Sequence, residues 1–129
     1  MKKASVFGLA LLFLCASFPA AAQTSVIATA TVSFDFMAGG QTFPAGSYRI
    51  EHVKTPNYLV LRSVDGKHTG NVKILTRLNP SSGSDIELVF DEVGNQRYLA
   101  EIEMPGMQGF HLQGAPGEHT HMSVKVSKK

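Results

Sequence analysis

The residues best suited to chemistry gather near the C-terminus of this chain. They are histidines and methionines: Met104, Met107, His111, His119, His121 and Met122. His119 and His121 are two positions apart in a segment that alternates polar and apolar residues, so both imidazoles project from one face of a strand and can bind one metal ion together. Methionine thioethers beside imidazoles suit copper, above all Cu(I). The pattern therefore predicts a candidate metal site at His119 and His121, with a copper-type ion as its occupant.

The same residues admit a plainer interpretation. Met122 alternates with the two histidines and should point to the other face of the strand, and Met104 fits a core position. A His-x-His pair can also be no more than the polar face of a solvated strand. The sequence leaves both interpretations open.

Other kinds of active site find little support. No Gly-x-Ser-x-Gly elbow is present, and the serines cluster in a polar loop at Ser81, Ser82 and Ser84, where turn formation explains them. Glu101 and Glu103 alternate with apolar residues and fit the polar face of a strand. No glycine-rich phosphate loop opens a helix, because no helix is predicted beyond the N-terminal segment. We therefore expect a protein that is not an enzyme, with no catalytic and no cofactor-binding residues.

The elements that must position these side chains are β-strands, because the hydrophobic period is two nearly everywhere. The first alternating run reads Val26, Ala28, Ala30, Val32, Phe34 and Phe36. Asp65-Gly66 is a strong hairpin turn. The predicted later strands cover residues 47–54, 58–64, 68–78, 86–91, 98–104 and 119–127, with a short apolar segment at 110–112. Seven or eight short antiparallel strands predict an all-β sandwich or small barrel.

The alternation also predicts which side chains form the core. The expected core residues are Val32, Phe34, Phe36, Tyr48, Ile50, Ile74, Leu88, Phe90, Ile102 and Val124. A second apolar set falls on the opposite positions of the same strands: Leu59, Leu61, Leu75, Val89 and Leu99. Three explanations are open: the sheets of a sandwich curl, the register of these strands is off by one residue, or the second set forms an exposed apolar strip that meets a partner or a second copy.

Residues 1–22 have the pattern of an export signal. Lys2 and Lys3 precede an apolar run that is too short for a membrane-spanning helix, and Ala20-Ala21-Ala22 supplies the small residues of a cleavage site. We expect cleavage after Ala22, a single all-β domain over residues 23–129, and a periplasmic or extracellular location with no transmembrane segment left.

The composition of the chain argues against thiol-based sites and against nucleic acid as a partner. The only cysteine, Cys15, lies in the leader, so the mature protein has no thiol chemistry, no iron–sulfur cluster and no cysteine-based zinc site. Loss of Lys2 and Lys3 leaves acidic and basic residues equal in number. No basic patch favours nucleic acid, because only the terminal lysines cluster.

Two segments resemble a loose group of small exported bacterial β-proteins. Phe34-Asp35-Phe36 through Ile50 is similar to their "FDF…G…PAG.Y.I" opening, and Leu88-Val89-Phe90 with Tyr98-Leu99-Ala100-Glu101-Ile102 is similar to their later "LVF…G..Y.LAEI" hairpin. The likeness covers about residues 32–104. It implies an exported β-domain, and it carries over no functional residues because the group has no assigned activity.

Two functions are therefore expected from the sequence. The leading one is a non-enzymatic exported β-domain that binds an unknown protein or a small apolar ligand at the cell envelope, or associates with copies of itself. The alternative is a periplasmic metal-binding protein of the copper type that uses the C-terminal histidines and methionines.

Overall fold

The structure is a computed structural model, and it describes residues 23–126. The predicted leader, its cleavage site and Cys15 lie outside the described residues, as do residues 127–129. All regular structure in the described part is β. The strands are β1 (Thr24–Val32), β2 (Phe36–Ala38), β3 (Gln41–Phe43), β4 (Gly46–Val53), β5 (Tyr58–Ser63), β6 (Thr69–Lys73), β7 (Thr76–Leu78), β8 (Glu87–Val93), β9 (Gln96–Glu103), β10 (Gly109–His111) and β11 (Thr120–Lys125). Within these residues no helix is long and apolar enough to cross a membrane.

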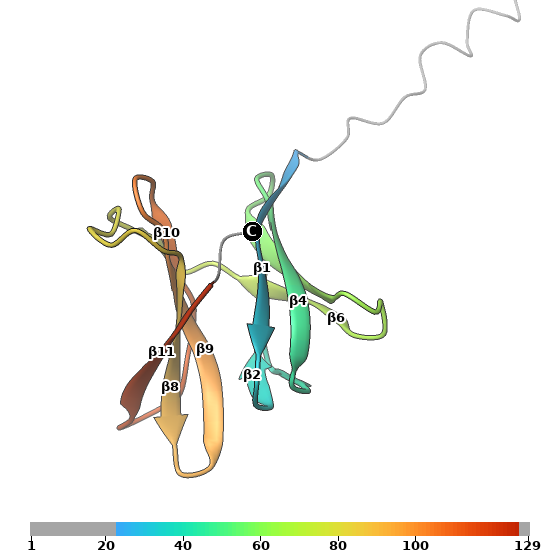
Figure 1. The fold of residues 1–129 in the computed structure, drawn as a ribbon, viewed down its shortest axis with the longest axis vertical. Coiled ribbons are helices and arrows are strands. Elements are labelled where there is room, and N and C mark those ends of the chain that lie inside the picture. Colours follow the sequence, from blue (N-terminus) through green and yellow to red (C-terminus); the bar gives the residue numbers. More distant parts are fainter. Residues whose placement is uncertain (1–22, 127–129) are drawn as a thin grey trace, which may run out of the picture.

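The strands form two sheets that pack as the layers of a sandwich (Figure 1). The smaller sheet has the order β1-β4-β5-β6, and the larger has the order β11-β8-β9-β10-β7. The short strand β2 pairs with β3 and, in parallel, with β9, while the other strand pairs are antiparallel. The prediction of an all-β, largely antiparallel domain is confirmed, and of the two predicted architectures the structure has the sandwich.

The core between the sheets is aromatic at its centre. Phe36, Phe43 and Tyr48 pack against one another with ring centroids 5.4–5.7 Å apart, and the Phe90 ring lies 5.6 Å from that of Phe36. Phe90 is fully buried. Of the predicted core, only Phe34 and Val124 are partly buried residues packed against this cluster rather than members of it. The alternation therefore identified the inward face of most strands.

The first predicted run is interrupted in the structure. β1 ends at Val32, and Phe36 opens β2 in the other sheet. The Asp35 Oδ1 atom accepts a hydrogen bond from the Ala45 backbone N–H at 3.0 Å, which holds the chain in a bend between the two strands. A hydrogen bond from a side chain to a backbone group ten residues away does not alter the hydrophobic alternation, so the sequence does not reveal this bend.

The prediction of an exposed apolar strip is wrong, because most of the side chains assigned to it are buried. Leu59, Leu61 and Leu99 belong to the core, Val89 is also buried, and only Leu75 is exposed. In β9 the cause is a β-bulge: the register shifts between Val89 and Phe90. The extra residue changes the phase of the strand, so that Leu99 and Ile102 both face inward although they are three positions apart.

The predicted strand over residues 68–78 is two strands in different sheets. β6 belongs to the smaller sheet and β7 to the larger one. Between them Ile74 stays in the core while the Leu75 backbone N–H bonds to the His111 carbonyl, 2.8 Å away. The chain thus crosses from one layer to the other in two residues, and Leu75 is left at the surface.

The segment from Leu112 to Glu118 matters most for the functional site. It leaves β10 with the Leu112 backbone N–H bonded to the Ala100 carbonyl at 2.7 Å and then runs to the start of β11. Strand β11 is the outer strand of the larger sheet and pairs with β8, so that His121 stands opposite Asp91. We call residues 112–118 the crossing segment.

Candidate metal centre

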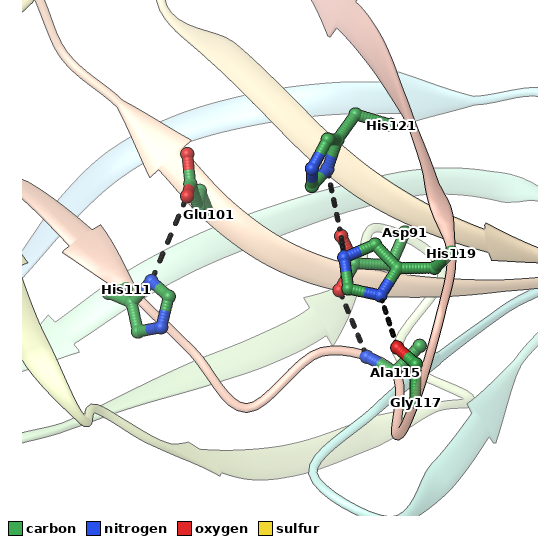
Figure 2. A network of polar contacts seen from close by, with 7 residues as sticks. All are labelled: Asp91, Glu101, His111, Ala115, Gly117, His119 and His121. Carbon is green, nitrogen blue, oxygen red and sulfur yellow. Dashed lines mark hydrogen bonds and ion pairs between the residues drawn. The ribbon is translucent and has the colours of Figure 1, made fainter.

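Both predicted metal ligands converge on a third residue, Asp91 (Figure 2). The Asp91 Oδ1 atom lies 3.1 Å from His121 Nδ1 and 3.4 Å from His119 Nε2. The two imidazole rings meet edge to face, with centroids 4.9 Å apart. One ligand atom from each of the three residues lies within 4.8 Å of the other two. We call these three residues the Asp91 cluster.

The distances suit a small ion bound by all three residues. Two donor atoms about 2.1 Å from a tetrahedral ion lie about 3.4 Å from each other. The two nitrogen–oxygen separations of the cluster are close to this value.

Asp91 is a buried carboxylate on a sheet face. Its side chain is only 6% exposed, because the crossing segment lies over it. The Ala115 backbone N–H donates to Asp91 Oδ2 at 3.0 Å. Gly114 permits this approach: a Cβ at that position would lie 2.3 Å from Oδ2 and 3.0 Å from the Ala100 Cβ. One oxygen of the carboxylate is therefore held by the backbone.

The other oxygen, Oδ1, is buried and makes no hydrogen bond to the described residues. The two imidazole nitrogens are near enough for ion pairs, but they are not aligned as hydrogen-bond donors. A buried carboxylate oxygen without a partner is costly, because it has lost its water. A positive charge between Oδ1 and the two imidazoles, either a proton or a metal ion, would satisfy this oxygen.

His119 is oriented by a backbone carbonyl. Its Nδ1 lies 2.8 Å from the Gly117 oxygen, and since a carbonyl can only accept, Nδ1 must carry the hydrogen. In the neutral imidazole the lone pair is then on Nε2, the atom that faces Asp91 Oδ1. Two lone pairs repel each other unless a proton or a metal ion lies between them. Metal-binding histidines commonly donate their second nitrogen to a carbonyl in this way.

The methionines of the sequence prediction do not join the cluster. Met104 is buried in the core, and Met107 is an exposed residue of the turn before β10. Met122 stands opposite Phe90 in the β8–β11 ladder, so it alternates with His121 and faces the other way. His111 lies elsewhere on the sheet, where its Nδ1 is 3.8 Å from Glu101 Oε2 (Figure 2).

Sequence reasoning missed Asp91 because nothing in the sequence pairs it with the histidines. It shares a strand face with Glu87 and Val89 and alternates with Leu88 and Phe90, which fits the polar face of a strand. An acidic residue that becomes buried by a later glycine-rich segment has no local signature. Only the pairing of β8 with β11 brings it opposite His121.

Comparison of the chain with protein family models, with curated proteins and with solved structures gave no match. The function is therefore argued from the geometry of the Asp91 cluster.

Proposed function

We propose that this protein is an exported β-sandwich domain that binds a divalent transition-metal ion at Asp91, His119 and His121. The observation that carries the proposal is the buried Asp91 Oδ1 atom, which makes no hydrogen bond to the described residues and faces two imidazole nitrogens. A cation bound there would satisfy the carboxylate and separate it from the lone pair of His119.

The donor set favours ions of intermediate softness. Two imidazole nitrogens and one carboxylate oxygen suit Zn²⁺, Cu²⁺ and Ni²⁺, whereas Cu(I) prefers thioether and thiolate sulfur. The positions of the methionines argue against the Cu(I) carrier suggested by the sequence. The geometry therefore supports a site for a divalent ion, with two imidazoles and a carboxylate as its ligands.

Export is part of the proposal and is supported by the sequence of residues 1–22. A thiol-free domain suits an oxidising compartment, because it has no cysteine for a metal or an oxidant to attack. With three protein ligands the ion keeps a coordination position for water or for an outside donor. Such a site suits the capture or carriage of metal ions at the cell envelope better than a purely structural role.

The test is calorimetric titration of the purified protein with Zn(II), Cu(II) and, under reductant, Cu(I). We expect micromolar or tighter binding of the divalent ions and no comparable binding of Cu(I). The double variant His119→Ala/His121→Ala should lose the binding. The variant His111→Ala is the matched control, because it removes a half-buried imidazole of the same sheet that lies outside the Asp91 cluster, and it should leave the affinity unchanged.

The affinity should also fall in acid. Imidazoles generally take up a proton near pH 6.5, and a protonated ring has no lone pair for a metal ion, so binding should weaken as the pH falls through about 6.5. Affinity no greater than that of an unstructured histidine-containing peptide, or equal in the double variant, would contradict the proposal. In that case His121 would be only part of the polar face of β11, and His119 only a polar residue just before that strand.

A further inference from the structure

Strand β1 lies at one end of the smaller sheet, and in the described residues its one partner strand is β4 (Figure 1). With nine residues it is the longest strand of the described part. Residues 23–33 include no charged residue and no proline. Natural edge strands commonly carry lysine, other charges or proline, because these residues prevent pairing with another chain. β1 is therefore a long sheet edge without the usual protective side chains.

The other end strands of the two sheets are protected. β6 contains Lys73, and the β2–β3 turn packs against this strand, since a Cβ at Gly39 would lie 2.5 Å from the Asn71 carbonyl oxygen. β7 is only three residues long and contains Arg77. β11 contains Lys125 and a histidine of the Asp91 cluster. Charges, short length and cover by a loop are the devices that keep sheet edges from pairing. The contrast identifies β1 as the edge that is open to pairing.

The hydrogen bonds of β4 show which backbone groups of β1 point outward. The Ser47 carbonyl accepts from the Val64 N–H at 2.9 Å, so the backbone groups of Ser47 point toward β5. Thr31 stands opposite Ser47 and must then point its own N–H and C=O away from β4. The hydroxyl oxygens of these two residues lie 2.8 Å apart, which fits such a narrow pair without backbone bonds.

The same alternation applies to Thr29, two positions before Thr31. Both threonines are exposed, and the backbone of neither one bonds to another described residue. The residue between them, Ala30, points its backbone groups toward β4. The outer edge of β1 thus presents two N–H and C=O sets in the spacing of an antiparallel ladder.

We propose that two copies of this chain pair through β1, antiparallel and related by a twofold axis. With the axis at Ala30, Thr29 of each copy stands opposite Thr31 of the other copy, and each such pair exchanges both N–H···O bonds. The two 4-stranded sheets then become one continuous sheet. Every residue at this interface meets its symmetric counterpart, as in other twofold dimers.

The absence of charge is the reason that a second copy fits this edge. Pairing about a twofold axis brings the same side chains of both copies near one another, so a charged edge would repel its own copy, whereas a neutral one does not. Cross-strand threonine pairs are favourable, and Ala30 at the axis is small enough for close approach. The register shift between Val26 and Ala28 limits regular pairing to residues 28–32. We therefore expect a weak dimer.

The test is sedimentation equilibrium of the purified protein at concentrations from micromolar to near-millimolar. EDTA is present, so that no metal ion joins two copies. We expect a reversible equilibrium between monomer and dimer. Thr29→Pro removes an outward N–H and leaves the bonds to β4 in place. It should weaken association roughly tenfold, because the dimer loses one hydrogen bond on each side of the axis.

Thr31→Lys is the second variant, and it leaves the backbone unchanged, so it decides the matter if the proline variant fails to fold. It should also weaken association, and high salt should restore part of the loss by screening the two added charges. Thr76→Lys is the matched control, because Thr76 is an exposed threonine of β7, at the end of the other sheet. Its association should equal that of the wild-type protein.

Amide hydrogen exchange locates the pairing. The Thr29 and Thr31 amides should exchange more slowly as the protein concentration rises, since only the dimer provides them with acceptors. The Ala30 amide faces β4 in monomer and dimer and is the internal control. A mass that stays that of the monomer, a dimer that both β1 variants keep, or protection that rises in other strands instead would overturn the proposal. None of these results bears on the Asp91 cluster, whose metal binding is measured separately.

Discussion

Two groups of histidine and carboxylate side chains lie on the same face of the larger sheet, and they differ in one respect. Asp91 and His121 are cross-strand neighbours in the β8–β11 ladder, and Glu101 and His111 are cross-strand neighbours in the β9–β10 ladder. The Asp91 side chain is 6% exposed, whereas that of Glu101 is 29% exposed. Figure 2 shows both groups, with the crossing segment passing beside Asp91.

The comparison shows that burial, and not residue type, separates a candidate metal site from an ordinary surface pair. The Glu101 carboxylate keeps water around it, so its 3.8 Å contact with His111 contributes little. The crossing segment excludes water from Asp91 and provides one hydrogen bond in its place, from the Ala115 N–H to Oδ2. A cation would satisfy the remaining oxygen, and one nitrogen of each imidazole lies within 3.4 Å of it.

The sharpest test of this difference exchanges each carboxylate for an amide. Asp91→Asn should weaken Zn²⁺ binding by more than the roughly 10- to 100-fold that loss of an outer-shell partner costs, since it removes a ligand. Stability without metal should not fall, because the amide can accept from Ala115 and donate to the lone pair of His119. Glu101→Gln should leave Zn²⁺ affinity unchanged. Calorimetry measures the Zn²⁺ affinity of both variants, and thermal unfolding measures their stability. Equal effects of the two substitutions on Zn²⁺ affinity would contradict the distinction between the two groups.

A second test acts on the cover over Asp91 through its glycines. Gly114 and Gly117 both have positive φ, +66° and +75°, but only at Gly114 would a Cβ collide with Asp91 and Ala100. Gly117→Ala should cost about 1–2 kcal/mol for its backbone conformation. Gly114→Ala should cost about 1–3 kcal/mol more, because the added methyl group forces the crossing segment off the carboxylate. Chemical denaturation measures both, and equal losses would show that the segment is not packed tightly on Asp91.

The smallest expected effect concerns Glu103, beside Glu101. Burial raises the pKa of Glu103, and the negative charges of Glu101 and Glu87 raise the pKa further. A raised pKa in the folded state means that the protonated form is favoured by folding, so stability is lost as the pH rises through that pKa. Glu103→Gln should therefore raise the melting temperature slightly at pH 7.

The gain in melting temperature should vanish near pH 3, where Glu103 is protonated in both states. Glu118→Gln is the control, because Glu118 is exposed in the crossing segment and should show no such pH-dependent gain. A gain that is the same at both pH values would mean that charge repulsion among these glutamates does not limit stability.

Individual strands show where the alternation of the sequence predicted the core correctly and where it did not. The alternation of Leu88 and Phe90 places both in the core, because period two is a local property of an extended chain. The same reasoning fails at Leu99, where the bulge opposite β8 shifts the phase of β9. It fails again at residues 33–35, where Asp35 bends the chain toward the second sheet. Both failures arise from contacts with residues far along the chain.

The candidate site divides in the same way. The spacing of His119 and His121 was sufficient to predict that two imidazoles lie close together, and the β class also follows from the sequence, since each depends on residue type and local period. Asp91, its burial under the crossing segment and the exclusion of the methionines were decided only by the tertiary structure. They depend on which strands pair and on what covers them, and these are the outcome of packing the whole chain into two sheets.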